Sequence, residues 1–371
     1  MRTFVFTCLL LLGMTTFAQD ANFHIYLCLG QSNMEGNAKV EEQDTVAVDS
    51  RFQVLAAVDC PNLGRTKGNW YKAVPPLARC YTGLTPGDYF GRAMVANLPS
   101  NVRIGIINVA VGGCRIELFD KDNYQSYVAT SPDWLKNMVK EYGGNPYARL
   151  VEMAKLAQKD GVIKGVLLHQ GESNTNDKDW PLKVKGVYDN LLNDLGLSAA
   201  NVPLLAGEVV HADQNGVCAS MNTIIDSLPQ VIPTAHVISS AGCPAAFDNL
   251  HFTAEGYRML GARYAAKMLS ILGYGDWTSA QNMKLWYNRP AQDWLEALPL
   301  GNSRLGAMVF GGTAREELQL NEETFWAGGP YNNNNPKGLQ VLPEIRRLIF
   351  EGKTLEAQKL IDENYMTPQH G

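Results

Sequence analysis

A serine, a histidine and an aspartate in this chain have the types and surroundings that nucleophilic catalysis needs. Ser32 follows the apolar run 23–29 and lies in a tight turn that contains Gly30. A serine hydroxyl becomes a good nucleophile when a base takes its proton, and an imidazole does this well near neutral pH. His251 offers the imidazole, and Asp248, three residues earlier, offers a carboxylate that can fix the tautomer and orientation of the ring. This spacing predicts a serine hydrolase.

Acyl transfer also needs hydrogen-bond donors directed at the charge that develops on the carbonyl oxygen. The backbone amide of Ser32 and one amide of the Gly112-Gly113 turn could supply two of these donors. A side-chain amide in segment 169–174 could supply a third. We therefore expect an oxyanion hole that is built from three separate loops.

Several residues near these segments also have plainer interpretations. Ser32 could be a turn or N-cap serine. Ser173 lies in a stretch that resembles a nucleophile elbow but lacks its closing glycine, so we do not expect it to be the nucleophile. Glu172 is expected to brace its neighbours through buried hydrogen bonds rather than to act as an acid, and His169 is expected to be structural.

The hydrophobic pattern predicts the elements that position these residues. Short apolar runs indicate strands, and stretches with helical spacing lie between several of them. Such alternation favours a mostly parallel sheet with helices on both faces, in which ligands bind at the carboxyl ends of the strands. The polar segments described above would meet at that edge. The predicted strands are 23–29, 103–109, 162–168, 202–206 and 236–239, and the predicted helices are 147–159, 182–195, 221–228 and 254–272, the last with Thr253 as its N-cap.

Composition limits the possible classes of function. The 371 residues are 46% hydrophobic and 19% charged, which is ordinary for a globular protein, and this length suggests two domains. The net charge is −5 and no basic stretch stands out, so a nucleic-acid partner is not expected. The sequence has no CxxC pair and no His/Cys cluster with zinc spacing, so neither a metal nor another cofactor is expected.

Residues 1–18 have the pattern of a secretory signal peptide. A charged start at Arg2 precedes an apolar core at 4–12, and Ala18 stands at a suitable cleavage position. A membrane anchor is the alternative, but the apolar run is shorter than the ~20 residues that span a bilayer. We therefore expect cleavage after Ala18, export to the periplasm or the outside of the cell, and no membrane association.

Cleavage would remove Cys8 from the seven cysteines of the chain. In an exported protein, the locally plausible disulfides are Cys60–Cys80 and Cys218–Cys243. Cys28 and Cys114 lie at strand ends and are expected to be buried as small hydrophobic residues.

Four sequence blocks resemble those of the SGNH hydrolases. The blocks are 30–34, 108–113 followed by Ile116-Glu117, 169–174 and 248–251. More narrowly they are similar to the sialate O-acetylesterase-like carbohydrate acetylesterases, which include carbohydrate esterase families 6 and 20. The resemblance covers about residues 22–272. It implies a three-layer α/β/α, flavodoxin-like domain at 19–275 that removes acetyl groups from glycan hydroxyls.

The resemblance also implies a role for each candidate site residue. Ser32 would be the nucleophile that forms an acetyl-enzyme, with the histidine as its base and the aspartate as the orienting carboxylate. The backbone amides of Ser32 and Gly113 would line the oxyanion hole. For the third donor, Gln170 is favoured over Asn174, and the choice stays open. The expected partner is an acetylated oligosaccharide or polysaccharide.

Beyond residue 275 the sequence changes character. Glycines and prolines punctuate short apolar runs, which is typical of turns and short strands, and 342–361 predicts a helix. Segments 285–291, 298–308 and 320–326 are similar to the start of the N-terminal β-domain of glycoside hydrolase family 95, a family of α-L-fucosidases and α-galactosidases. This resemblance implies an incomplete domain at 281–371, with the catalytic residues of the family in a later helical barrel.

The sequence is also compatible with three other functions. The chain could be part of an α-L-fucosidase polypeptide, an SGNH esterase that acts on lipid or other non-sugar esters, or a catalytically silent glycan-binding module. The absence of a long apolar segment among the loops after the strands disfavours the lipid esterase. The intact catalytic blocks disfavour the silent module.

Overall fold

The computed structural model of the protein describes residues 19–274, 287, 289–302, 304–325 and 335–365. The chain divides into two compact units, Met1–Met283 and Lys284–Gly371, and each is described by itself. The predicted signal peptide at 1–18 lies outside the described residues.

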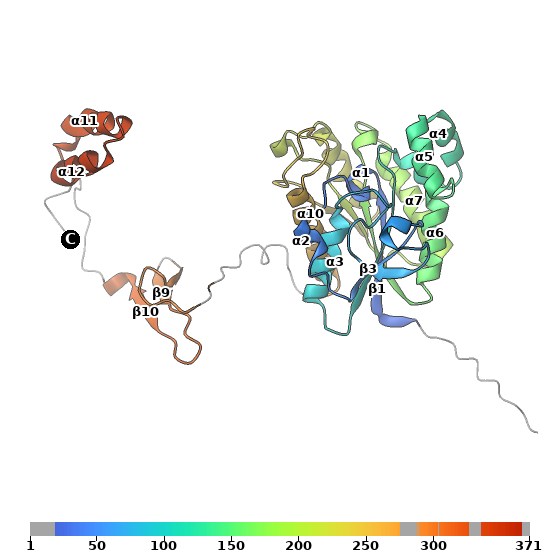
Figure 1. Ribbon diagram of the computed structural model, residues 1–371, viewed down its shortest axis with the longest axis horizontal. Helices are drawn as coiled ribbons and strands as arrows, with labels where there is room; N and C mark the ends of the chain where they lie inside the picture. The colour runs from blue at the N-terminus through green and yellow to red at the C-terminus, as the bar shows by residue number, and fades with distance from the viewer. Residues whose placement is uncertain (1–18, 275–286, 288, 303, 326–334, 366–371) are drawn as a thin grey trace, which may run out of the picture. The chain divides into compact units, whose positions relative to one another are not determined.

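The first unit is built on a seven-stranded sheet with the strand order β3-β2-β4-β1-β5-β6-β7 (Figure 1). Every neighbouring pair is parallel except β2 and β3, which are antiparallel. The mainly parallel α/β class is therefore confirmed. The strands are β1 Asp20–Gly30, β2 Phe52–Leu55, β3 Trp70–Lys72, β4 Arg103–Ala110, β5 Gly161–His169, β6 Leu204–Gly207 and β7 Ala235–Ile238.

Helices cover both faces of this sheet. Figure 1 shows α3 (Pro86–Asn97) and α10 (Ala254–Ile271) on one side, with α6 (Pro146–Ala157) and α7 (Trp180–Leu195) on the other. Each face has its own hydrophobic core, because buried side chains of α3 and α10 form one cluster and those of α6 and α7 form another. The remaining helices are α1 Ser32–Glu35, α2 Glu42–Thr45, α4 Tyr124–Thr130, α5 Asp133–Glu141, α8 Asn222–Ile225 and α9 Leu228–Val231.

All five predicted strands are confirmed to within three residues at either end, whereas β2 and β3 were not predicted. Thr253 is confirmed as the N-cap of α10, since its side chain accepts a hydrogen bond from the Gly256 amide at 3.1 Å. The single helix predicted at 221–228 is wrong. The structure has the short α8 there and starts a new helix, α9, with Pro229 in its first turn, where the missing N–H of proline is tolerated.

The carboxyl ends of the three central strands lie level with one another. Gly30, the last residue of β1, pairs with Ala110 of β4 and with His169 of β5. A Cβ at Gly30 would lie 2.0 Å from the His169 carbonyl oxygen, so only glycine permits this close approach. The loops after β1, β4 and β5 therefore begin side by side.

One of the two predicted disulfides is present in the structure and the other is not. The Cys60–Cys80 disulfide is present. The Cys218–Cys243 pairing is wrong, because both residues are free. They lie on opposite faces of the sheet, since Cys243 belongs to the core under α3 and α10 while Cys218 packs against the core under α6 and α7. The two remaining cysteines, Cys28 and Cys114, are buried as expected.

The second unit contains a three-stranded antiparallel sheet and two helices. The strands are β8 Leu298–Gly301, β9 Leu305–Val309 and β10 Leu318–Glu322, in the order β10-β9-β8. The helical character predicted for 342–361 is confirmed, but the chain forms two helices there, α11 (Gly338–Phe350) and α12 (Thr354–Asn364). Gly352, with a φ of 75°, separates them. Within the described parts of both units, no helix is long and apolar enough to cross a membrane.

Candidate active site

Ser32 lies at the point where β1 ends and α1 begins. The preceding residue, Gln31, donates its backbone amide to the His169 carbonyl at 3.0 Å. Its side-chain oxygen also accepts from the amide of Ser173 at 3.2 Å. Two contacts thus fix the turn that carries Ser32 against the loop after β5.

The structure brings the three predicted catalytic side chains into one hydrogen-bonded chain. His251 Nε2 lies 2.8 Å from Ser32 Oγ, and His251 Nδ1 lies 2.7 Å from Asp248 Oδ2. An imidazole between a hydroxyl and a carboxylate is arranged to take the serine proton while the carboxylate holds the ring. The serine comes from the first turn after β1, and the other two come from the loop before α10.

Asp248 is also held by the backbone of its own loop. Its Oδ1 accepts hydrogen bonds from the amides of Leu250 and His251, both at 3.0 Å. Partial burial opposes ionisation, but these hydrogen bonds and the one from the His251 ring outweigh it and lower the pKa of Asp248. The carboxylate is therefore charged over the range in which an imidazole can act as a base.

The Gly112-Gly113 turn lies beside the serine. A Cβ at Gly112 would be 3.8 Å from Ser32 Cβ, and Gly113 adopts a φ of 68° that favours glycine. The amide of Gly112 donates to Glu35 Oε2 at 3.1 Å. Within the described residues, the amides of Ser32 and Gly113 have no hydrogen-bond acceptor, so both can serve as donors to a ligand.

The two candidates for the third donor are both buried and already engaged. Gln170 Nε2 has three acceptors, which are Gln31 Oε1 at 3.1 Å, the Cys114 carbonyl at 3.3 Å and Asn174 Oδ1 at 2.7 Å. Asn174 Nδ2 donates to Glu117 at 3.1 Å and to a second carboxylate, Asp177, at 3.0 Å. The N–H groups of both side chains therefore contact other acceptors in this structure.

Ser173 has no catalytic partner in the described part of the chain. Its hydroxyl donates to the Gly113 carbonyl at 3.0 Å. Glu172 accepts a hydrogen bond from Asn33, and burial raises the pKa of this glutamate. His169 is fully buried, which lowers its pKa to about 3. The hydrogen bond of Glu172 to Asn33 is that of a bracing group, as expected, whereas neither ring nitrogen of His169 has a hydrogen-bond partner among the described residues.

Two residues at the site were missed by the sequence reasoning. Asn33 binds the Glu172 carboxylate and the Leu250 carbonyl, and it accepts from Tyr257. Glu35 binds the glycine turn. Both residues lie within three positions of Ser32, and this closeness could have marked them as site residues. Their contacts could not be predicted, because their partners are far away in the sequence. Among the described residues no group of His, Cys, Asp and Glu side chains could hold a metal ion.

Comparisons with known proteins give a family for the first unit. Residues 22–270 match the family described as "carbohydrate esterase, sialic acid-specific acetylesterase". A probable carbohydrate esterase of Arabidopsis thaliana is 26% identical over 264 residues, which cover 66% of this chain and 90% of that protein.

Two solved structures resemble the fold of the first unit. A protein from Arabidopsis thaliana has a TM-score of 0.52 and 22% identity, covering 68% of this chain and 99% of its own. NanS has a TM-score of 0.50 and 15% identity, covering 70% of this chain and 99% of its own. At these identities the likeness concerns the fold.

The second unit has different relatives. Residues 285–370 match the N-terminal domain of glycosyl hydrolase family 65. An α-L-fucosidase 2 of Arabidopsis thaliana is 43% identical over 75 residues, and a probable α-fucosidase A of Aspergillus niger is 40% identical over 74. The chain spans only 9% of the length of each of these fucosidases. The expected joining of an acetylesterase domain to a glycosidase N-terminal domain is confirmed.

The family match covers more than half of the chain, and the site within it has the geometry of a serine esterase. The chain therefore belongs to the carbohydrate esterase family of sialic acid-specific acetylesterases.

Proposed function

We propose that this protein removes acetyl groups from sugar hydroxyls through an acetyl-enzyme on Ser32. The observation that carries this proposal is the continuous contact from Ser32 Oγ through His251 to Asp248, with distances of 2.8 Å and 2.7 Å. It occurs at the carboxyl edge of the sheet, where ligands bind in open parallel sheets.

The reaction proceeds in two steps. His251 takes the proton of Ser32, whose oxygen attacks the acetyl carbonyl, and the amides of Ser32 and Gly113 stabilise the oxyanion. The imidazolium, held by Asp248, then protonates the sugar oxygen as its bond to the acetyl carbon breaks, which releases the sugar hydroxyl and leaves an acetyl-enzyme. A water molecule, deprotonated by the same histidine, releases acetate. No cofactor enters either step.

The third oxyanion donor remains a proposal. Gln170 or Asn174 could contribute an N–H only by releasing an acceptor that it now holds. Gln170 is the better candidate, because its amide has three acceptors for two hydrogens and can leave one of them without losing a full hydrogen bond.

Aromatic side chains near the site support a sugar substrate. Trp134 is 53% exposed, and its ring would meet a Cβ on Gly113 at 2.7 Å, so it lies against the oxyanion turn. Phe247, adjacent to Asp248 in the chain, is fully exposed. Aromatic faces of this kind favour contact with the apolar face of a sugar ring. We propose a sialate or acetylxylan type of acetyl ester as the substrate.

The second unit supports a glycan as the larger target. We propose that it is an N-terminal domain of the glycoside hydrolase family 95 type, which its similarity to fucosidases favours. A role as part of an α-L-fucosidase is the alternative. The adjacent carboxylates Glu322 and Glu323 are not proposed to act as a glycosidase acid–base pair, because Glu322 accepts hydrogen bonds from its neighbours Thr324 and Arg304.

We also propose export, with residues 1–18 as the signal peptide. The Cys60–Cys80 disulfide supports this, because such bonds persist in oxidising compartments.

A panel of esters tests the proposed function. Purified protein is assayed for acetate release from O-acetylated sialic acid, acetylated xylan oligosaccharides and p-nitrophenyl acetate, and for hydrolysis of a long-chain lipid ester and of a fucoside. Acetate release from at least one acetylated sugar with no fucose release is expected. Faster hydrolysis of the lipid ester than of every sugar acetate would favour the non-sugar esterase, and fucose release would restore the glycosidase.

A further inference from the structure

A buried ion pair is formed by the last residue of α1, the short helix that begins with Ser32. Glu35, the last residue of α1, accepts from Arg79 Nε at 2.9 Å and from Nη2 at 2.6 Å. The side chains are only 9% and 12% exposed. The other carboxylate oxygen of Glu35 accepts the amide of Gly112 at 3.1 Å. One carboxylate thus joins Arg79 to the turn beside Ser32.

This turn needs an external support because it is made of two glycines. Glycine has access to a wider range of backbone conformations than other residues, so the peptide between Gly112 and Gly113 can rotate at low cost. That peptide carries the Gly113 N–H, which points to a ligand only in some of these orientations. A hydrogen bond from Gly112 to a fixed carboxylate selects one orientation of the turn.

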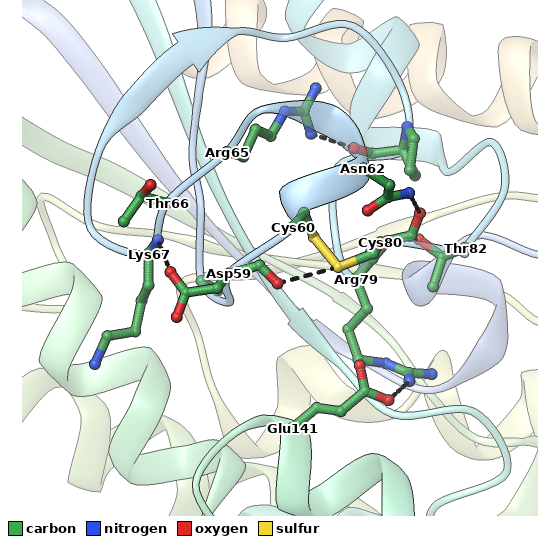
Figure 2. The surroundings of a disulfide bond; sticks show 12 residues. Asp59, Cys60, Asn62, Arg65, Thr66, Lys67, Arg79, Cys80, Thr82 and Glu141 are labelled. Atoms are coloured by element: carbon green, nitrogen blue, oxygen red, sulfur yellow. Dashed lines mark hydrogen bonds and ion pairs between the residues drawn. A yellow bond between two sulfur atoms is a disulfide. The ribbon is translucent and has the colours of Figure 1, made fainter.

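The backbone at Arg79 is held by the adjacent Cys60–Cys80 disulfide. Arg79 directly precedes Cys80, which is bonded to Cys60, and Figure 2 shows its side chain extending from the disulfide toward Glu141. Nη1 of the arginine contacts Glu141 Oε1 at 2.5 Å. The chain after Cys80 then returns to the end of α1, where the Gly83 amide donates to the Gly36 carbonyl at 2.7 Å.

We propose that Glu35, held by Arg79, is a positioning residue that orients the Gly112-Gly113 turn for oxyanion binding, and that the Cys60–Cys80 disulfide keeps Arg79 within reach of it. The inference rests on the proposed function, because the orientation of the Gly113 amide matters to catalysis only if Ser32 performs acyl transfer. Neither Glu35 nor Arg79 contacts the reacting atoms in this account.

Paired substitutions separate positioning from plain stability. Glu35→Met/Arg79→Met replaces the buried ion pair with apolar side chains of similar length, a change that is often neutral in stability. The double variant should melt near the wild-type temperature and still lose roughly tenfold or more in kcat for p-nitrophenyl acetate, with KM little changed, because an oxyanion donor acts in the transition state. Glu141→Gln, which breaks only the outer contact of the same arginine, is the matched control and should keep kcat within about twofold. A double variant with wild-type kcat would overturn the proposal.

A second readout does not depend on activity. Hydrogen exchange of the Gly112 amide should be slow in the wild type and in Glu141→Gln, and clearly faster in Glu35→Met/Arg79→Met. If the wild type shows no esterase activity, the proposed function fails, and the amide exchange still tests the positioning. Unchanged exchange at Gly112 in the double variant would refute the positioning role by itself.

The disulfide is tested by its coupling to the ion pair. Reduction of Cys60–Cys80 in the folded enzyme, or Cys60→Ser/Cys80→Ser, should lower kcat of the wild type by about threefold or more. The same treatment should leave the kcat of the already impaired Glu35→Met/Arg79→Met variant nearly unchanged. The reason is that the disulfide is proposed to affect catalysis only through the Glu35–Arg79 ion pair, which this variant lacks. An equal fold loss in both backgrounds would show that the disulfide acts elsewhere and would overturn this part of the proposal.

Discussion

Asn33 donates a hydrogen bond of 3.1 Å from Nδ2 to the carbonyl oxygen of Leu250. Asn33 directly follows Ser32 and Leu250 directly precedes His251, so the bond joins the two halves of the site across 217 positions of sequence. The same amide also binds the Glu172 carboxylate, and its oxygen accepts from the Tyr257 hydroxyl at 2.6 Å. The spacing between serine and histidine is therefore set by a buried side chain that belongs to neither.

Asn33→Ala should impair both catalysis and stability. Loss of the amide leaves Glu172 and Tyr257 without this partner, which costs about 1–3 kcal/mol of unfolding free energy for each buried group. The loop that carries His251 also loses its hydrogen bond from Asn33 to the Leu250 carbonyl, so kcat should fall about tenfold or more. Steady-state kinetics and thermal unfolding measure the two effects. Asn97→Ala is the control, because it removes a side-chain-to-carbonyl bond of 2.8 Å at the far end of α3. Equal kcat losses in the two variants would argue against a role of Asn33 in positioning the His251 loop.

Asp248→Asn should reduce kcat by roughly 10³–10⁴-fold while the protein stays folded. The amide cannot hold the imidazole in the tautomer that accepts the serine proton, and it no longer stabilises the imidazolium. The measurement is kcat for p-nitrophenyl acetate, with circular dichroism as the check on folding. A loss smaller than about tenfold would mean that another group orients His251.

Acid should destabilise the fold through His169. Burial lowers the pKa of His169 to about 3, whereas an unfolded histidine titrates near 6.5. Between these values the unfolded chain binds a proton that the folded one does not, so stability is full above about pH 6.5 and declines as the pH falls toward 3. The slope is about 1.4 kcal/mol per pH unit.

His169→Gln should lack the part of the pH dependence of stability that comes from the buried histidine. Unfolding free energies of the wild type and the variant are compared across pH 3–7 by denaturant titration. The difference between the two should shrink as the pH falls. Parallel curves would show that the buried histidine does not titrate in this way.

The thiol count distinguishes the two disulfide predictions. The denatured, unreduced chain without residues 1–18 should react with a thiol reagent at four positions, the free cysteines Cys28, Cys114, Cys218 and Cys243. Two further thiols should appear only after reduction of Cys60–Cys80. A chain that retained Cys8 would show one more thiol. Two thiols before reduction would restore the Cys218–Cys243 pairing.

Local signals in the sequence were sufficient for much of the fold and for the contact of Ser32 with His251 and Asp248. The apolar runs of β1, β4 and β5 are buried on both sides, so their pattern does not depend on distant partners. Asp248 and His251 share one turn, and their relation could be predicted from three residues of spacing. Thr253 likewise caps its helix through a contact with Gly256, three residues away.

The missed features depend on contacts between distant segments. β2 and β3 are short strands at one side of the sheet, and they are defined by the pairing of β2 with β4 and of β3 with β2 rather than by their own pattern. The support of Gly112 by Glu35 depends on Arg79, which comes from a disulfide-bonded loop. Cys218 and Cys243 are close in sequence, but the sheet separates them.

Acetate release by Ser32→Ala, with Ser173→Ala as the matched control, tests the central claim most directly. The two serines lie in neighbouring loops, but only Ser32 contacts His251, whereas Ser173 donates to the Gly113 carbonyl. Ser32→Ala should lose at least about 10³-fold in kcat on acetylated sugar and p-nitrophenyl acetate, while Ser173→Ala should retain most of its activity. Activity that survives in Ser32→Ala and disappears in Ser173→Ala would contradict the central claim.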